Sequence, residues 1–223
     1  MKPPSPLVIF FSLTISHARN LGQVLETKWN GVVSRLKAGG TLRVGVGLPA
    51  INTVDPRYGK TLEILLSACK GHDCYFIAQT PYDKSRLLNY AKDRVNEGNI
   101  LHFNDGVEEW FQFMRSLDFV VSTRIHGGMA GVANNIPALF IPTDLRILEL
   151  VNSMKLPFVL LEAVIQNDSV SLATLLAAAK KNFREFETNR LSHLNEYRIL
   201  LESIGLEMHP DLVDILDPQP RFF

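Results

Sequence analysis

The fold is indicated most clearly by residues 118–141, which read DFVVSTRIHGGMAGVANNIPALFI. The apolar run in Asp118–Ser122 is typical of a strand that is covered on both faces in a parallel sheet. Small residues in Gly127–Asn134 predict a helix, and Ala138–Ile141 is a second apolar strand. A strand, a helix and a strand in this order predict the right-handed crossover of a parallel sheet.

The same alternation continues on both sides of this unit. Further strands are expected at Leu7–Leu13, Leu42–Gly47, Cys74–Ala78 and Ile100–Phe103. Helices are expected at Asn20–Leu36, Tyr58–Lys70, Ser85–Val95, Val107–Leu117 and Leu145–Met154, with a long helical tail over Ser171–Ile204 that is broken at most once. Short apolar strands separated by longer helices predict an α/β fold, a Rossmann-like doubly wound parallel sheet.

The composition excludes several classes of protein. The chain has 223 residues, of which 46% are hydrophobic and 21% charged, a profile typical of globular proteins. Lys and Arg together number 23 and balance 23 Asp and Glu, so no basic excess indicates a nucleic-acid partner. The longest apolar run, residues 7–15, is shorter than the roughly 20 residues of a membrane span and is interpreted as a buried strand rather than a signal peptide.

The two cysteines, Cys69 and Cys74, have His72 between them and could suggest a metal site. A structural zinc site needs four ligands, usually in two close pairs, and the sequence offers no second pair. We therefore expect no metal and no cofactor. Two thiols without a cysteine framework fit a reducing compartment, which favours a cytoplasmic protein.

The segment Ser122–Gly128 follows a predicted strand and carries the most chemistry. Ligands of doubly wound sheets bind beyond the carboxyl ends of the strands. Gly127 and Gly128 would let the backbone approach a ligand, and a helix start favours an anion. Arg124 can bind a phosphate or carboxylate at two points, and His126 can move a proton near neutral pH. The sequence thus predicts an anion pocket with an acid–base group.

A purely structural interpretation of the same residues stays open. Arg124 could pair with Asp118 or Asp144, and His126 could merely cap the helix.

A second group of polar residues follows the next strand. Thr143 or Asp144 can cap the following helix, and Arg146 in its first turn needs a partner, for which Glu149 is a candidate. Alternatively, Asp144 and Arg146 stand beside the Ser122–Gly128 segment and contribute to its site.

These patterns resemble those of the polysaccharide pyruvyl transferase family. The similarity lies in Asp118–Gly127, in Asn135–Ile141 and in Asp144–Leu150, and Tyr75–Gln79 looks like the family's strand that ends in glutamine. It extends over roughly residues 39–157.

The resemblance implies one half of a glycosyltransferase-B-like fold and a transfer of pyruvate. Enzymes of the family move the enolpyruvyl unit of phosphoenolpyruvate onto two hydroxyls of a sugar, as a ketal, in cell-surface or exopolysaccharide biosynthesis. His126 would be the catalytic general acid. The substrate-binding residues would be Arg124, Ser122, Ile125, Gly127, Gly128, Asp144, Arg146 and Gln79.

The resemblance also divides the chain. Residues 1–38 would be the remnant of an N-terminal domain with its crossover helix, residues 39–160 the donor-binding domain, and residues 161–223 a C-terminal helical segment. A homo-oligomer or a partner would supply the missing domain, and an apolar patch would be exposed near residues 48–51. Arg57 and Lys60 are candidates for a second basic group at the donor.

Two other functions remain open. One is a nucleotide-sugar glycosyltransferase-like domain, and the other is a non-catalytic, truncated family member that acts as a binding protein. The order Arg-x-His favours the pyruvyl transferase, whereas the missing half favours the binding protein.

Overall fold

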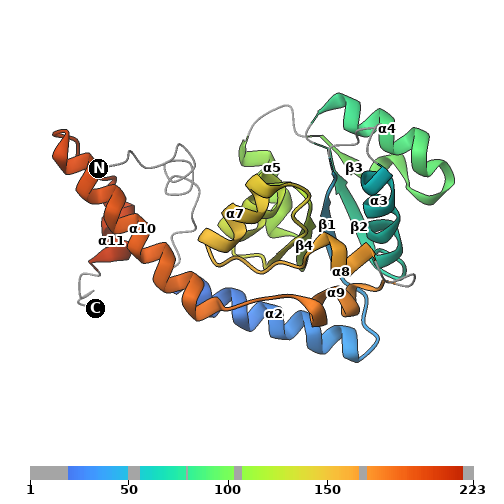
Figure 1. Cartoon of the computed structure of the whole chain (residues 1–223), viewed down its shortest axis with the longest axis horizontal. Coiled ribbons are helices and arrows are strands. Elements are labelled where there is room, and N and C mark those ends of the chain that lie inside the picture. The colour runs from blue at the N-terminus through green and yellow to red at the C-terminus, as the bar shows by residue number, and fades with distance from the viewer. Residues whose placement is uncertain (1–19, 50–55, 79, 103–106, 166–169, 218–223) are drawn as a thin grey trace.

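The computed structural model describes residues 20–49, 56–78, 80–102, 107–165 and 170–217. These residues form a central sheet with helices on both of its faces (Figure 1). α3 (Pro56–Ala68) lies on one side of the sheet and α5 (Val107–Arg115) on the other. The strand expected at Leu7–Leu13 lies outside the described residues.

The sheet is parallel throughout and has the strand order β3-β2-β1-β4-β5. The strands are β1 (Arg43–Gly47), β2 (Asp73–Ile77), β3 (Ile100–Leu101), β4 (Phe119–Ser122) and β5 (Ala138–Phe140). The predicted doubly wound α/β fold is confirmed. Because the chain order reverses between β1 and β4, the switch point of the sheet lies at their carboxyl ends, where ligands of such folds bind.

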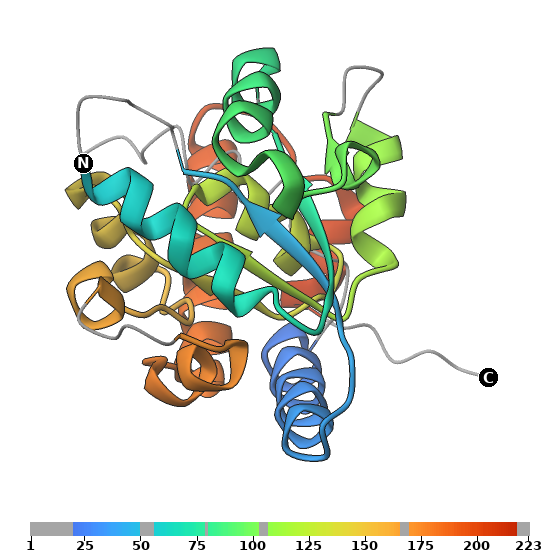
Figure 2. The ribbon, with the colours of Figure 1, turned by 90° about the vertical axis from the view of Figure 1, so that its right-hand side faces the viewer.

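Most of the remaining helices lie around this sheet, as Figure 2 shows from the side, whereas the last two in the chain extend away from it (Figure 1). They are α2 (Leu21–Lys37), α4 (Pro81–Ala91), α6 (Ile125–Ala133), α7 (Leu145–Ser153), α8 (Leu161–Ile165), α9 (Leu172–Ala178), α10 (Phe183–Ser203) and α11 (Pro210–Leu216), with 3-10 turns at Lys92–Arg94 and Glu97–Asn99.

α4 begins four residues before the predicted start at Ser85. The chain turns into the helix at Thr80, whose hydroxyl accepts a hydrogen bond from Asp83 N at 3.3 Å while Asp83 Oδ2 accepts one from Thr80 N at 3.0 Å. This is a reciprocal cap, and Pro81 occupies the first helical position, where its missing N–H costs nothing. The spacing of apolar residues did not reveal this start because the first turn of α4 is polar.

α6 begins two residues before the predicted start at Gly127. Only Thr123 and Arg124 separate it from β4. Thr123 is fully buried, and both its N–H and its hydroxyl donate to Gly47 O, at 3.1 Å and 3.0 Å. These bonds fasten the start of α6 to the end of β1, so the turn is short and leaves no glycine loop.

The C-terminal tail agrees with the prediction in part. The helical stretch expected over Ser171–Ile204 is broken once, into α9 and α10, whereas α11 was not predicted. The break lies at Lys180, which exchanges backbone hydrogen bonds with Phe158 at 2.8 Å and 3.0 Å. Phe158 also bridges to Phe140 of β5, so this segment extends the edge of the sheet.

The aromatic core joins α2 to the sheet and to α10. Trp29 of α2 is fully buried, and its ring meets Phe119 edge-on at 5.3 Å and Phe183 at 5.7 Å between centroids. Figure 1 shows α10 continuing past α2 and leaving the sheet together with α11. A smaller apolar cluster holds these two helices together through Leu194, Met208, Leu212 and Ile215.

The expectation of an exposed apolar patch near residues 48–51 is wrong at Leu48, which is buried in the main core. Ile51 lies outside the described residues.

Candidate functional site

The candidate site lies at the carboxyl end of β4, beside β1 at the switch point of the sheet. Ser122 ends β4 and is fully buried. Its hydroxyl donates to Arg124 O at 2.6 Å and accepts from Arg124 N at 3.2 Å. Ser122 therefore shapes the turn that presents Arg124.

Arg124 forms a bidentate ion pair with Asp83 of α4. Nη2 lies 2.9 Å from Asp83 Oδ1, and Nη1 lies 3.1 Å from Oδ2. The side chains are 18% and 3% exposed, respectively, so the pair is shielded from water. Two parallel charge-assisted bonds fix the plane of a guanidinium. The structural interpretation had named Asp118 or Asp144 as the partner, and that pairing is corrected to Asp83.

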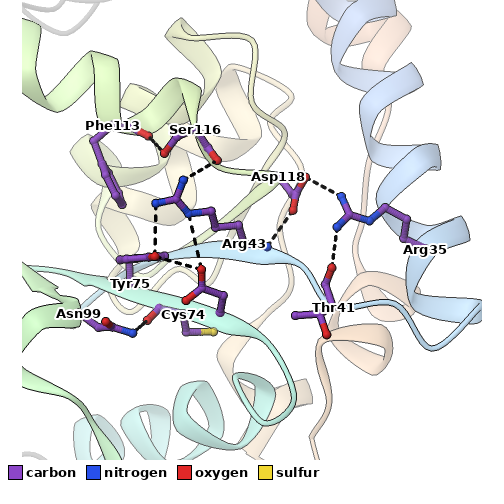
Figure 3. Close-up of polar contacts among 10 residues, drawn as sticks. Arg35, Thr41, Arg43, Cys74, Tyr75, Asn99, Phe113, Ser116 and Asp118 are labelled. Carbon is purple, nitrogen blue, oxygen red and sulfur yellow. Dashed lines mark hydrogen bonds and ion pairs between the residues drawn. The ribbon is translucent and has the colours of Figure 1, made fainter.

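Asp118 cannot pair with Arg124 because it lies at the amino ends of the strands, whereas Arg124 lies at their carboxyl ends. It precedes β4, binds Arg35 Nη1 at 2.6 Å and accepts a hydrogen bond from Arg43 N at 2.8 Å (Figure 3). Arg43 in turn lies over the ring of Tyr75, 4.8 Å from its centroid. This network joins the amino ends of β1, β2 and β4 and is structural.

Sequence reasoning missed Asp83 entirely. The residue is 2% exposed, which is rare for a carboxylate without a partner. One signal could have found it, namely the cap pattern of Thr80 and Asp83 that directly follows a strand end. The carboxyl ends of parallel strands share one edge, so a residue after β2 can reach one after β4.

His126 lies in the first turn of α6 and is partly exposed to solvent. Desolvation lowers its pKa from the ordinary value, and the positive charges of Arg146 and Arg124 lower it further. The imidazole is therefore neutral at pH 7. The N-cap of α6 is Arg124, so the expectation that His126 caps the helix is wrong.

Asp144 is the N-cap of α7, as one interpretation expected. Its Oδ1 accepts a hydrogen bond from Ile147 N at 2.8 Å. Arg146 is 83% exposed, and its Nη2 lies 3.7 Å from Asp144 Oδ2 rather than beside the suggested partner Glu149. The positive charge of Arg146 is one of the causes that lower the pKa of His126.

The second of the paired glycines, Gly128, has a packing role. Gly127 and Gly128 are buried within α6. A Cβ on Gly128 would stand 2.5 Å from Phe140 Cζ, so the glycine lets α6 lie directly on β5. Ile125 is partly buried against the same core. Whether these three residues contact a ligand stays a prediction.

The structure gives no support for placing the three remaining candidates, Gln79, Arg57 and Lys60, in the site. Gln79 lies outside the described residues, as does the side chain of Arg57. Lys60 is exposed on α3, and among the described residues no hydrogen bond or ion pair joins it to Arg124 or His126.

Comparison with known proteins bears on this site directly. Residues 54–144 match the polysaccharide pyruvyl transferase family. The match confirms the resemblance seen in the sequence, over a narrower range than residues 39–157. It runs from before α3 to Asp144, so it contains Asp83, Arg124 and His126, while Arg146 lies two residues beyond it. Neither the search of curated proteins nor the search of solved structures found a match.

A cavity of about 440 Å³ lies elsewhere, between the end of α3, the start of β2 and the 3-10 turns. Cys69, His72 and Cys74 line it. The Cys74 thiol and burial raise the pKa of Cys69, which keeps it a protonated thiol. Within the described residues, no group of three or more His, Cys, Asp or Glu side chains could hold a metal ion. The cavity holds none of the residues of the candidate site.

Among the helices that the structure describes, none has the length and apolar character needed to cross a membrane.

Proposed function

We propose that this chain carries the donor site of a pyruvyl transferase that uses phosphoenolpyruvate and forms a pyruvate ketal on a sugar. The observation that supports this proposal is that Arg124 and His126 lie at the switch point of the sheet, within the segment that matches the family, while Arg146 lies on α7 just beyond that segment. An Arg pair and an imidazole suit a substrate that bears a phosphate and a carboxylate.

The donor would bind above the start of α6. The first-turn N–H groups and the dipole of a nine-residue helix favour an anion there. The positive charges of Arg146 and Arg124 both act on His126, since both lower its pKa. An anion between them would be attracted by both guanidinium groups. Ser122 would contribute by holding the turn rather than by touching the ligand.

His126 would act as the general acid. Its lowered pKa keeps it neutral in the free site, and a bound anion would offset the charges of Arg124 and Arg146 and so raise that pKa. The imidazolium could then give its proton to the methylene carbon of the enolpyruvyl group, which makes the adjacent carbon electrophilic. One sugar hydroxyl would add to that carbon, and the second would displace phosphate to close the ketal.

The acceptor would be a saccharide of a cell-surface polymer or exopolysaccharide. A second copy of the chain or a partner would supply the surface that binds it, and the reaction would take place in the cytoplasm, where phosphoenolpyruvate is available. The two reduced cysteines fit that compartment.

A thermal-shift titration separates this function from the alternatives. Phosphoenolpyruvate should raise the melting temperature by an amount that grows with its concentration over its dissociation constant. A shift with UDP-glucose and none with phosphoenolpyruvate would favour the nucleotide-sugar enzyme. No shift with either ligand would favour the non-catalytic member of the family.

A further inference from the structure

The ion pair between Asp83 and Arg124 joins segments that follow two strands which are not neighbours in the sheet. Asp83 follows β2 and Arg124 follows β4, and β1 lies between these two strands. Their ion pair therefore spans the carboxyl end of β1 at the switch point. No sequence pattern connected the two residues, which are 41 positions apart.

The carboxylate of Asp83 is held on two sides. Thr80 N donates to Oδ2 at 3.0 Å, and the two Arg124 nitrogens bind both oxygens. Because Asp83 is almost fully buried and tied to the start of α4, it is a rigid acceptor. A planar guanidinium bonded to both oxygens cannot turn without losing a charge-assisted bond.

We propose that Asp83 is a positioning residue, which holds the guanidinium of Arg124 beside His126 at the switch point. The proposal rests on the proposed function, since Arg124 is taken to bind the anionic donor. Two positive charges act on His126, those of Arg124 before α6 and Arg146 on α7. Each guanidinium has a carboxylate partner, Asp83 on α4 for Arg124 and Asp144 at the start of α7 for Arg146.

An opposite role for Asp83 makes a different prediction. If Asp83 were a competitor that occupies Arg124 until the donor arrives, its removal would release Arg124 to bind the donor more tightly. A double-mutant cycle separates the two roles, because it compares the effect of replacing Arg124 with and without Asp83. Removing Asp83 should reduce that effect if Asp83 positions Arg124, and should increase it if Asp83 competes with the donor.

The cycle consists of the full-length wild type, Asp83→Asn, Arg124→Met and the double variant, titrated with phosphoenolpyruvate by calorimetry. In the wild-type background Arg124→Met should weaken binding about ten- to hundredfold, because each charge-assisted bond contributes roughly 1.5–3 kcal/mol. In the Asp83→Asn background it should weaken binding less than about threefold, since Arg124 is no longer held in place. An equal or larger loss there would overturn the proposal. If Arg124→Met does not fold, Arg124→Lys closes the same cycle.

A second readout does not depend on the donor. The His126 pKa is followed by NMR in the same four variants without any ligand. Arg124→Met should raise this pKa, because it removes a positive charge, and should raise it less in the Asp83→Asn background. A purely structural role of Asp83 at the start of α4 would leave the effect of Arg124 unchanged and would overturn the proposal. If the wild type binds no phosphoenolpyruvate, the proposed function fails while this readout still decides the role of Asp83.

Glu63→Gln is the matched control. Glu63 forms a similar bidentate pair with Arg94, at 2.7 Å and 2.8 Å, away from the candidate site. The effect of Arg124→Met on the His126 pKa should be the same in the Glu63→Gln background as in the wild type. A change there would mean that any lost ion pair alters the site, and the proposal would be wrong.

Discussion

Gly47 of β1 and Ser122 of β4 face each other with no room for a side chain between them. They are paired in the parallel register, and a Cβ on Gly47 would stand 2.9 Å from Ser122 Cβ. Real Cβ atoms do not approach so closely, so the glycine is required by packing. Because Ser122 also shapes the turn that carries Arg124, the contact links the centre of the sheet to the candidate site.

Gly47→Ala should destabilise the protein by about 1–3 kcal/mol, the usual cost of overpacking a core. Urea denaturation measures this free energy of unfolding. Gly31→Ala is the control: Gly31 lies in α2 with nothing near its Cβ position, so alanine should stabilise the helix by roughly 0.5–1 kcal/mol. Equal effects of the two substitutions would contradict the packing argument.

Trp29→Ala should cost about 3–5 kcal/mol of stability, because the buried ring joins α2 to Phe119 of the sheet and Phe183 of α10. Trp29→Phe keeps part of these contacts and should cost less. Ile204→Ala, at a side chain that is 62% exposed, should change stability by less than about 0.5 kcal/mol. A loss of similar size at Ile204 would show that α10 is held differently.

The His126 pKa should depend on salt. Positive charges contribute to its depression, and salt screens partly exposed charges, so added salt should move the pKa up toward its ordinary value. His72 is the internal control, since desolvation alone lowers its pKa. NMR titrations at two ionic strengths should show a larger shift for His126, and equal shifts would speak against the influence of Arg124 and Arg146.

The same two pKa values predict a pH dependence of stability. Both are lower in the folded chain than the ordinary value of about 6.5, so the unfolded chain binds more protons in the window between the folded pKa and that value. The contribution of His72 and His126 to stability should therefore fall as the pH falls through this window. Replacing both by Gln should flatten the slope of the unfolding free energy against pH there, whereas an unchanged slope would contradict the assignment.

The five strands β1 to β5 could be predicted because apolar runs and strand ends are local in sequence. The ion pair between Asp83 and Arg124 could not, since it depends on the order of β2, β1 and β4 in the sheet. The packing of Gly128 could not be predicted for a similar reason: Phe140, the side chain that its Cβ would meet, becomes a neighbour only when α6 packs on β5. The first turn of α4 is short and polar. It carries a cap pattern but no regular spacing of apolar residues, so the start of the helix was not predicted.

The central claim, that Arg146 and His126 belong to a donor site with Arg124, is tested most directly by calorimetric titration of the full chain with phosphoenolpyruvate. Arg146→Ala is the informative variant, because its side chain is 83% exposed and its loss should not affect folding. Binding should weaken about tenfold, as expected for one charge-assisted bond, while the distant control Arg184→Ala on α10 binds like the wild type. If the wild type shows no binding, or if Arg146→Ala binds as tightly as Arg184→Ala, the donor does not bind at this edge of the sheet.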